Sequence, residues 1–159
     1  QLVHDVAEGA TLDEGAVRAL EVLRRHPGHE ETSAAVVKAL WMSRAPRGTT
    51  ADVESLGGGW VAEEALAIGL YAALAAQDFE HGVLLAVNHS GDSDSTASIA
   101  GSLLGLALGE LAIPRRWVER LELRDVIEQV ADDLHRHYGT GSLPCEGGQC
   151  GSWARYPPS

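Results

Sequence analysis

The stretch Asn88-His89-Ser90-Gly91-Asp92-Ser93-Asp94-Ser95-Thr96-Ala97 places two carboxylates and several hydroxyls on a turn, just before an apolar helix expected from about Ser95. Two Asp side chains two residues apart repel each other unless a positive group lies between them. Oxygen donors of this kind suit Mg²⁺, Ca²⁺ or Mn²⁺ rather than zinc. The free N–H groups at the start of the helix would also favour a phosphate nearby. The stretch therefore predicts a cation site beside a helix N-terminus.

Outside this turn, the apolar residues recur with helical spacing, which predicts an all-α chain. The pattern Thr11-x-x-Glu14 is typical of a capping box, and Asp78 is a suitable N-cap for a later helix. Besides the helix after the turn, helices are expected from 11 to the stop at 26–28, and over 31–43, 51–56, 61–76, 79–87 and 124–137. We expect one domain over residues 1–139, followed by an irregular Gly-, Pro- and Ser-rich tail over 140–159.

The helix after the turn carries small residues at four-residue spacing: Ala97, Gly101, Gly105 and Gly109. Another backbone could approach closely along such a stripe. Each glycine inside a helix costs roughly 1 kcal/mol relative to alanine. We therefore expect tight helix packing beneath the turn to compensate for this cost.

The composition is that of a soluble globular domain, with 45% hydrophobic residues in 159 and a formal net charge of −11. This charge argues against binding to a nucleic-acid polymer or an anionic membrane. Neither a signal peptide nor an apolar run of membrane-spanning length is found, so we expect a cytoplasmic protein. Because Gln1 is not an initiator, we expect a fragment or a processed piece. Cys145 and Cys150 could equally form a disulfide or stay as free thiols.

Two known motifs fit the turn poorly. An EF-hand loop starting at Asp92 would have Ala97 in place of its glycine and Leu103 in place of its final Glu. The letters of Asp92, Asp94 and Thr96 resemble the nucleophile motif of haloacid-dehalogenase-like phosphatases. That motif follows a buried strand of an α/β fold, whereas the residues before Asp92 predict a helix. A phosphatase of this kind is therefore the weakest functional hypothesis, after the two that follow below.

A wider pattern resembles the ADP-ribosylglycohydrolase family. It combines the turn and its continuation, Asn-His-Ser-Gly-Asp-Ser-Asp-Ser-Thr-Ala-x-x-Ala-Gly-x-Leu-Leu-Gly over 88–105, with Leu-Gly-Gly-Gly-Trp-Val-Ala-Glu-Glu-Ala-Leu over 56–66 and Leu-Glu-Leu-Arg-Asp over 121–125. The resemblance spans about 11–138 and corresponds to the C-terminal half of the family domain. It implies a multi-helical, orthogonal helix bundle that is incomplete in this chain.

The resemblance also implies a function. Members of this family bind two Mg²⁺ or Mn²⁺ ions and hydrolyse the C1″ glycosidic bond that links ADP-ribose to a modified side chain. By this likeness Asp92, Asp94 and Ser95 are metal ligands, with Ser95 standing where many members have Thr. The likeness further suggests that Gly58, Gly59 and Trp60 lie against the ADP-ribose. A second interpretation of these three residues stays open, in which the glycines end a short helix and Trp60 packs in the core.

Two octahedral ions need about twelve oxygen positions, so three protein ligands are too few. Family members supply the others, and an acid/base residue, from an N-terminal half that has no counterpart here. The chain is therefore expected to need an N-terminal fragment of the same protein, to be inactive alone, and to expose apolar surface. The alternative is a non-catalytic ADP-ribose-binding or regulatory module. The sequence does not identify the acceptor. This half of the domain would meet the same ADP-ribose group whether it is linked to Arg, Ser, a nucleobase or a small molecule.

Three acids lie near the glycines and could replace the absent base: Glu54, Glu63 and Glu64. Their expected role is a charged first helical turn and a solvated face, since acids stabilise a helix N-terminus. His89 is interpreted as a supporting hydrogen-bond partner of the turn rather than as a metal ligand.

Overall fold

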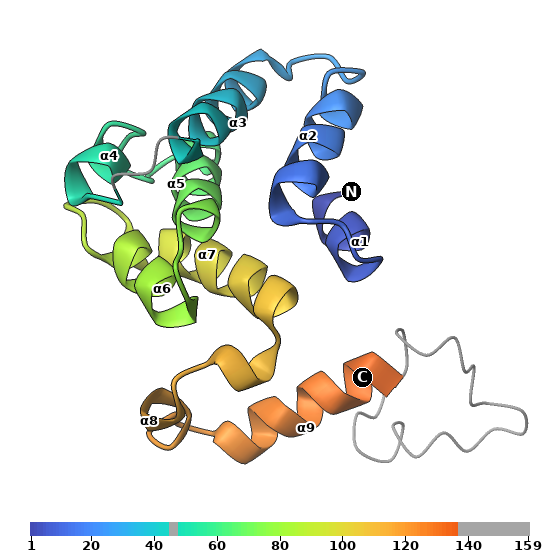
Figure 1. Cartoon of the computed structure of the whole chain (residues 1–159), viewed down its shortest axis with the longest axis vertical. Helices are drawn as coiled ribbons and strands as arrows, with labels where there is room; N and C mark the ends of the chain where they lie inside the picture. The colour runs from blue at the N-terminus through green and yellow to red at the C-terminus, as the bar shows by residue number, and fades with distance from the viewer. Residues whose placement is uncertain (45–47, 137–159) are drawn as a thin grey trace, which may run out of the picture. The chain divides into compact units, whose positions relative to one another are not determined.

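A computed structural model of the chain describes residues 1–44 and 48–136 (Figure 1). These residues form helices and no strand, which confirms the all-α prediction and excludes the α/β fold that a haloacid-dehalogenase-like phosphatase would need. The chain divides into two units, residues 1–114 and 115–159, and each is described by itself. None of the helices in the described part combines the length and the hydropathy needed to cross a membrane.

In its described residues, the first unit contains seven α-helices and one short 3-10 helix. In chain order these are α1 (Leu2–Ala7), α2 (Leu12–Leu23), α3 (Glu30–Ser43), α4 (Thr50–Glu54), α5 (Ala62–Leu74), α6 (Phe79–Val87), α7 (Ser93–Leu108) and η1 (Glu110–Ala112). The predicted helices are thus present with small shifts of their ends. The short α1 was not predicted, because six residues are too few to establish a helical period. Helix α7 begins at Ser93 rather than Ser95, so Asp94 lies inside its first turn.

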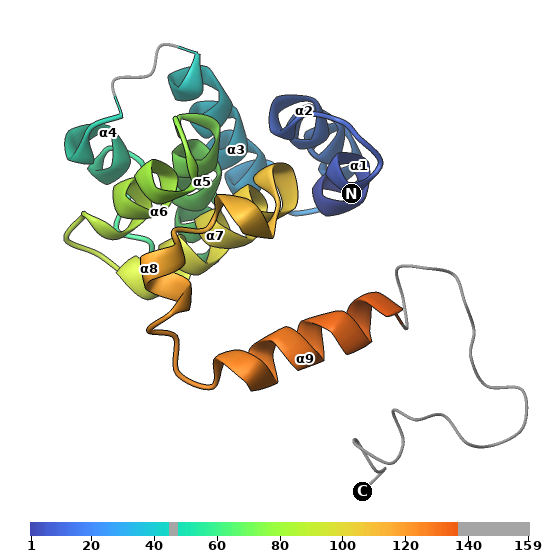
Figure 2. The ribbon, with the colours of Figure 1, turned by 60° about the horizontal axis from the view of Figure 1, so that its bottom comes forward.

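Helix α5 is the centre of this unit. It packs against α3, α6 and α7 (Figure 1; Figure 2), and α7 in turn packs against α6. Its fully buried side chains include Ile68, Leu70 and Tyr71. Burying the apolar surface of several such side chains stabilises the unit by about 2 kcal/mol for each large one. The loops that precede α5 and α7 are therefore attached to helices that the core holds in place.

Hydrogen-bonded caps define the helix starts. The Thr11 hydroxyl accepts from the N–H of Glu14 at 3.2 Å and the Glu14 carboxylate accepts from the N–H of Thr11 at 3.0 Å, as the sequence predicts. The Asp78 carboxylate accepts from the N–H of His81 at 2.7 Å and caps α6. Each such cap satisfies a backbone donor that a helix start leaves free, typically worth about 1 kcal/mol.

Helix α4 is held onto α5 through a buried phenol. Tyr71 is 1% exposed. Its hydroxyl bonds to the carboxylate of Asp52 and to the N–H of Gly48. Burial, and then the nearby Asp52 charge, raises the pKa of Tyr71 above its ordinary value. Because α4 leads directly into the glycines at 57–59, this contact helps to fix where that loop begins.

The glycine stripe of α7 does not behave as expected. Among the described residues, a Cβ added at Gly105 would meet nothing within 4 Å, and one at Gly101 would lie 3.9 Å from Val83 Cγ2. Gly109 is the C-cap of α7, with φ at 79°. The prediction of tight packing along this stripe is therefore wrong. The close approach occurs at glycines of the neighbouring helices, where a Cβ at Gly69 or Gly82 would come within 2.5 Å of Ile99 or 2.6 Å of Leu104.

Replacing Gly69 with alanine is expected to destabilise the protein by about 1 to 2 kcal/mol. The new Cβ would lie 2.5 and 2.7 Å from two atoms of Ile99 and 3.2 Å from the backbone nitrogen of Ala100, so α5 and α7 must separate. The better helix propensity of alanine offsets about 1 kcal/mol of this cost. Urea unfolding followed by circular dichroism measures the change. The control is Gly105→Ala, which should stabilise by about 0.5 to 1 kcal/mol; equal midpoints for the two variants would contradict the packing.

The second unit contains α8 (Arg115–Val118) and α9 (Arg124–Leu134). Along α9, Arg124 and Glu128 form an ion pair at 2.7 Å. The predicted apolar residues share one face of this helix: Val126, Ile127, Val130 and Leu134. The predicted end at residue 137, the tail over 140–159 and both cysteines lie outside the described residues. One domain over 1–139 stays a prediction.

Candidate functional site

The glycine loop, residues 57–60 between α4 and α5, touches the aspartate turn, residues 88–96, which joins α6 to α7 and includes the first turn of α7. The N–H of Asp92 donates to the carbonyl oxygen of Gly58 at 2.8 Å. Gly91 packs directly on the same peptide, because a Cβ added to it would lie 1.8 Å from the Gly58 oxygen. The fold therefore brings together the two segments that sequence analysis selected for metal and for substrate.

Gly59 completes the contact between the two segments. It is buried, has φ at +74°, and a Cβ there would lie 2.9 Å from Thr96 Cγ2 and 3.6 Å from Asp92 Cβ. Only glycine adopts this backbone conformation readily and leaves room for α7. In one of the two interpretations of the sequence, the bare backbone at 58–59 lies against a ligand. In this structure the space at Gly59 is filled by the first turn of α7.

Glu64 also holds the glycine loop. Its Oε2 atom accepts from the N–H of Gly58 at 3.0 Å and from the N–H of Gly59 at 3.1 Å. A Cβ at Gly57 would lie 2.4 Å from the Glu64 carboxyl carbon, so the side chain lies over that glycine. The expectation of a solvated face is wrong for Glu64, which is half-buried. Periodicity places Glu64 in the first turn of α5 but does not reveal where its carboxylate points.

Asp92, Asp94 and Ser95 lie at the N-terminus of α7. Asp92 occupies the N-cap position, yet its side chain makes no capping hydrogen bond. A hydrogen bond with the Asp92 side chain, and then the N–H of Ser95 at 3.0 Å, lower the pKa of Asp94 below its ordinary value. The two carboxyl groups thus influence each other at the start of α7. Such a pair favours a shared proton or a bound cation.

His89 and Thr96 stabilise the turn through hydrogen bonds inside it. The N–H of Gly91 donates to His89 Nδ1 at 3.1 Å, and His89 Nε2 lies 3.0 Å from the Thr96 hydroxyl. That hydroxyl is buried and donates to the carbonyl of Ala86 at 2.8 Å. A neutral His89 carrying its proton on Nε2 satisfies all three bonds. Its ring nitrogens are therefore engaged inside the turn. Sequence analysis missed Thr96 as a structural residue, because spacing alone does not show which hydroxyl points inward.

Trp60 does not pack in the core, as one interpretation of the sequence proposed. Its side chain is 73% exposed. The ring lies next to Gly58, since a Cβ there would be 2.7 Å from Trp60 Cδ1. An exposed indole beside the glycine loop is a surface on which a planar ring could stack.

The oxygen atoms at the start of α7 could supply part of the coordination shell of a cation. Two carboxylates and a hydroxyl, from Asp92, Asp94 and Ser95, are the oxygen ligands that Mg²⁺ or Mn²⁺ prefers. Within residues 1–44 and 48–136, no group of three or more His, Cys, Asp or Glu is placed to hold a metal ion. Glu54 lies close to the turn and accepts from the Ser90 hydroxyl at 3.2 Å. The residue types match a hard cation, while their number is that of an incomplete site.

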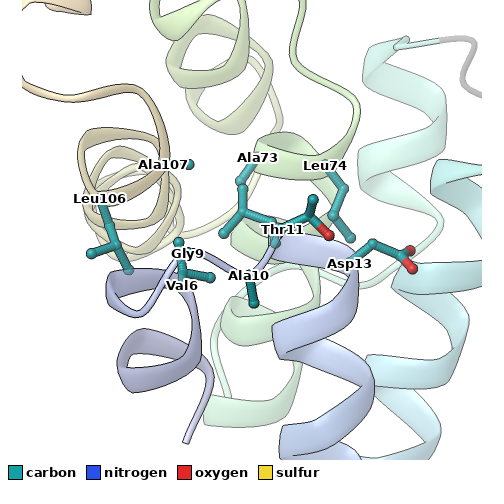
Figure 3. Close-up of a pocket in the computed structure, with 10 residues that line it drawn as sticks. Val6, Gly9, Ala10, Thr11, Asp13, Ala73, Leu74, Leu106 and Ala107 are labelled. Carbon is teal, nitrogen blue, oxygen red and sulfur yellow. The ribbon is translucent and has the colours of Figure 1, made fainter.

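A pocket of about 520 Å³ lies at the other end of α7 (Figure 3). It is lined mainly by apolar groups from the α1–α2 connection and the ends of α5 and α7: Val6, Gly9, Ala10, Thr11, Leu12, Asp13, Ala73, Leu74, Leu106 and Ala107. Roughly 17 Å of helix separates Leu106 from Ser95. None of the six predicted site residues lines this pocket, so it is separate from the aspartate turn.

Comparison with known proteins identifies the family. The ADP-ribosylglycohydrolase family matches residues 1–143, and the chain belongs to this family. An uncharacterized protein of Archaeoglobus fulgidus is 40% identical over 83 residues, which is 52% of this chain and 27% of that protein. The ADP-ribosylarginine hydrolases Tri1 of Pseudomonas putida and Serratia proteamaculans are 34% and 30% identical over 71 residues, or 45% of this chain and 19% of each hydrolase. The chain thus spans about a quarter or less of these relatives. No solved structure gives a significant match.

Proposed function

We propose that this chain is part of a Mg²⁺-dependent ADP-ribosyl-acceptor glycohydrolase, with the cytoplasm as its expected compartment. The enzyme would remove ADP-ribose from a modified side chain or a related acceptor by hydrolysing the C1″ glycosidic bond. Family membership supports this class of reaction. The observation that carries the proposal is the 2.8 Å hydrogen bond from Asp92 to Gly58, which joins the predicted metal turn to the predicted substrate loop. ADP-ribosylarginine is the first acceptor to test, because two relatives are named for it.

In this proposal Asp92, Asp94 and Ser95 hold the cation, with Mn²⁺ as a substitute for Mg²⁺. The chemistry that a divalent ion supplies when bound is polarisation of the ribose oxygens and orientation of water. The glycine loop is proposed to lie against the ADP-ribose at Gly58, and the exposed ring of Trp60 to stack on a base. Gly59, whose free side is filled by Thr96 and Asp92, would support this surface from inside. The contact between loop and turn would then keep substrate and cation in register.

The remaining cation ligands and the acid/base residue are proposed to come from an N-terminal part of the same protein. Three oxygen donors supply only a fraction of two octahedral shells. The chain alone is therefore expected to bind Mg²⁺ weakly, at about millimolar concentration or above, and to release no ADP-ribose. A calorimetric titration that showed tight binding at two sites by this chain alone would contradict the division of ligands.

The proposal is tested by the release of ADP-ribose. Intact mass spectrometry first establishes whether a second polypeptide accompanies the chain. The sample, with the N-terminal part supplied, is then incubated with an ADP-ribosylarginine peptide, and free ADP-ribose is quantified by chromatography with Mg²⁺ and with EDTA. We expect Mg²⁺-dependent release that falls by at least about 100-fold on chelation. Binding of ADP-ribose without release from Arg- or Ser-linked substrates would instead support the non-catalytic module.

A further inference from the structure

Glu64 connects the glycine loop to the start of α5 in an unusual way. It is the third residue of the helix, after the N-cap Val61, whose side chain forms no capping hydrogen bond. A glutamate here commonly bonds back to the N-cap residue. The Glu64 carboxylate instead reaches two loop donors, the N–H groups of Gly58 and Gly59, at 3.0 and 3.1 Å.

One peptide group links this carboxylate to the aspartate turn. The peptide between Gly58 and Gly59 gives its N–H to Glu64 at 3.1 Å, and its carbonyl oxygen accepts the N–H of Asp92 at 2.8 Å. Hydrogen bonds in such a chain polarise and strengthen one another, and a charged acceptor makes its own bond about twice as strong as a neutral one. The orientation of the peptide, and with it the position of Asp92, therefore depends on Glu64.

The same geometry argues against Glu64 as a catalytic base. Its Oε2 atom already accepts two N–H groups, and its carboxyl group lies against Gly57. Proton transfer to this carboxylate would remove the charge that strengthens its hydrogen bonds to the loop. Its contacts are those of a residue that holds backbone in place.

We propose that Glu64 is a positioning residue, which fixes Asp92 through the Gly58–Gly59 peptide and so controls cation binding at the aspartate turn without ligating the ion. The metal part of this inference rests on the proposed function of the turn. The positioning part depends only on the contacts among Glu64, the loop and Asp92.

Glu63 offers a matched control. It is the neighbouring acid in the first turn of α5, with the same charge and the same relation to the helix dipole. The loop N–H groups donate to the carboxylate of Glu64 and not to that of Glu63. Glu63→Ala therefore removes one charge from the same helix turn while leaving the contact between loop and turn intact.

The test uses the full 159-residue chain and three variants: Glu64→Ala, Glu64→Gln and Glu63→Ala. Amide hydrogen exchange by NMR reports on Gly58, Gly59 and Asp92, and water-proton relaxation measures Mn²⁺ binding. In Glu64→Ala we expect at least about tenfold faster exchange at Asp92 and about tenfold weaker Mn²⁺ binding. Glu63→Ala should stay within about twofold of the wild type. Glu64→Gln keeps an oxygen acceptor but loses the charge that strengthens its hydrogen bonds, so its Asp92 exchange rate should lie between those of Glu64→Ala and Glu63→Ala.

The exchange rates and the Mn²⁺ titrations test the two parts of the inference separately. Unchanged Asp92 exchange in Glu64→Ala, or equal effects of Glu64→Ala and Glu63→Ala, would overturn the positioning role. If circular dichroism shows that Glu64→Ala is unfolded, Glu64→Gln decides, because its Asp92 exchange must then exceed that of Glu63→Ala. A wild-type chain that binds no Mn²⁺ would count against the proposed metal site, while the exchange data would still support or overturn the positioning of Asp92.

Discussion

Gly91→Ala is expected to lower the free energy of unfolding by about 3 kcal/mol and to weaken Mn²⁺ binding by at least about tenfold. The added Cβ would lie 1.8 Å from the carbonyl oxygen of Gly58 and 2.5 Å from its carbonyl carbon. Both are backbone atoms, so no side-chain rotation relieves the overlap. The glycine loop must move away from the aspartate turn, which breaks the 2.8 Å hydrogen bond from Asp92 to Gly58.

Urea unfolding and Mn²⁺ relaxation titration measure the two effects separately. The control is Gly101→Ala in α7, the helix that follows the turn. The new Cβ would lie 3.9 Å from Val83, which is an ordinary contact distance. This variant should be neutral or stabilised by up to about 1 kcal/mol. Wild-type stability and wild-type Asp92 amide exchange in Gly91→Ala would show that the loop and the turn are not in contact.

Local features of the fold were readable from the sequence, because they depend on neighbouring residues. The capping box of Thr11 and Glu14 and the Asp78 cap each lie within four residues of their partners, and both are present. The apolar, alanine-rich segment that forms α5 was predicted for a similar reason, since its composition and spacing favour a buried helix. The aspartate turn was recognised in another way, from its resemblance to a motif of the ADP-ribosylglycohydrolase family.

Contacts between distant segments were not readable in the same way. Spacing showed that Gly101 and Gly105 share one side of a helix, but not that this side meets no close neighbour among the described residues, while Gly69 and Gly82 do. Similarly, the sequence indicated that Gly59 permits close approach without showing that the approaching group is Thr96. The role of Glu64 was hidden for the same reason, because its partners belong to a loop that precedes its own helix.

Replacing both Asp92 and Asp94 with asparagine is expected to weaken Mn²⁺ binding by at least about 100-fold, with little loss of stability. The Asp92 side chain lowers the pKa of Asp94 and makes no capping hydrogen bond. Removing their mutual repulsion should offset the lost interaction with the helix dipole, leaving the free energy of unfolding within about 1 kcal/mol of the wild type. Relaxation titration and urea unfolding provide both numbers.

This pair of measurements separates a cation site from a simple helix cap. If the acids only capped α7, the double variant would lose about 1 kcal/mol or more of stability and its Mn²⁺ binding would match the wild type. Ser95→Ala serves as a graded control, because it removes one exposed hydroxyl and neither charge; about a threefold weakening of Mn²⁺ binding is expected. Loss of Mn²⁺ binding with stability retained would therefore support a cation site at Asp92 and Asp94, and the opposite pair of results would support a helix cap.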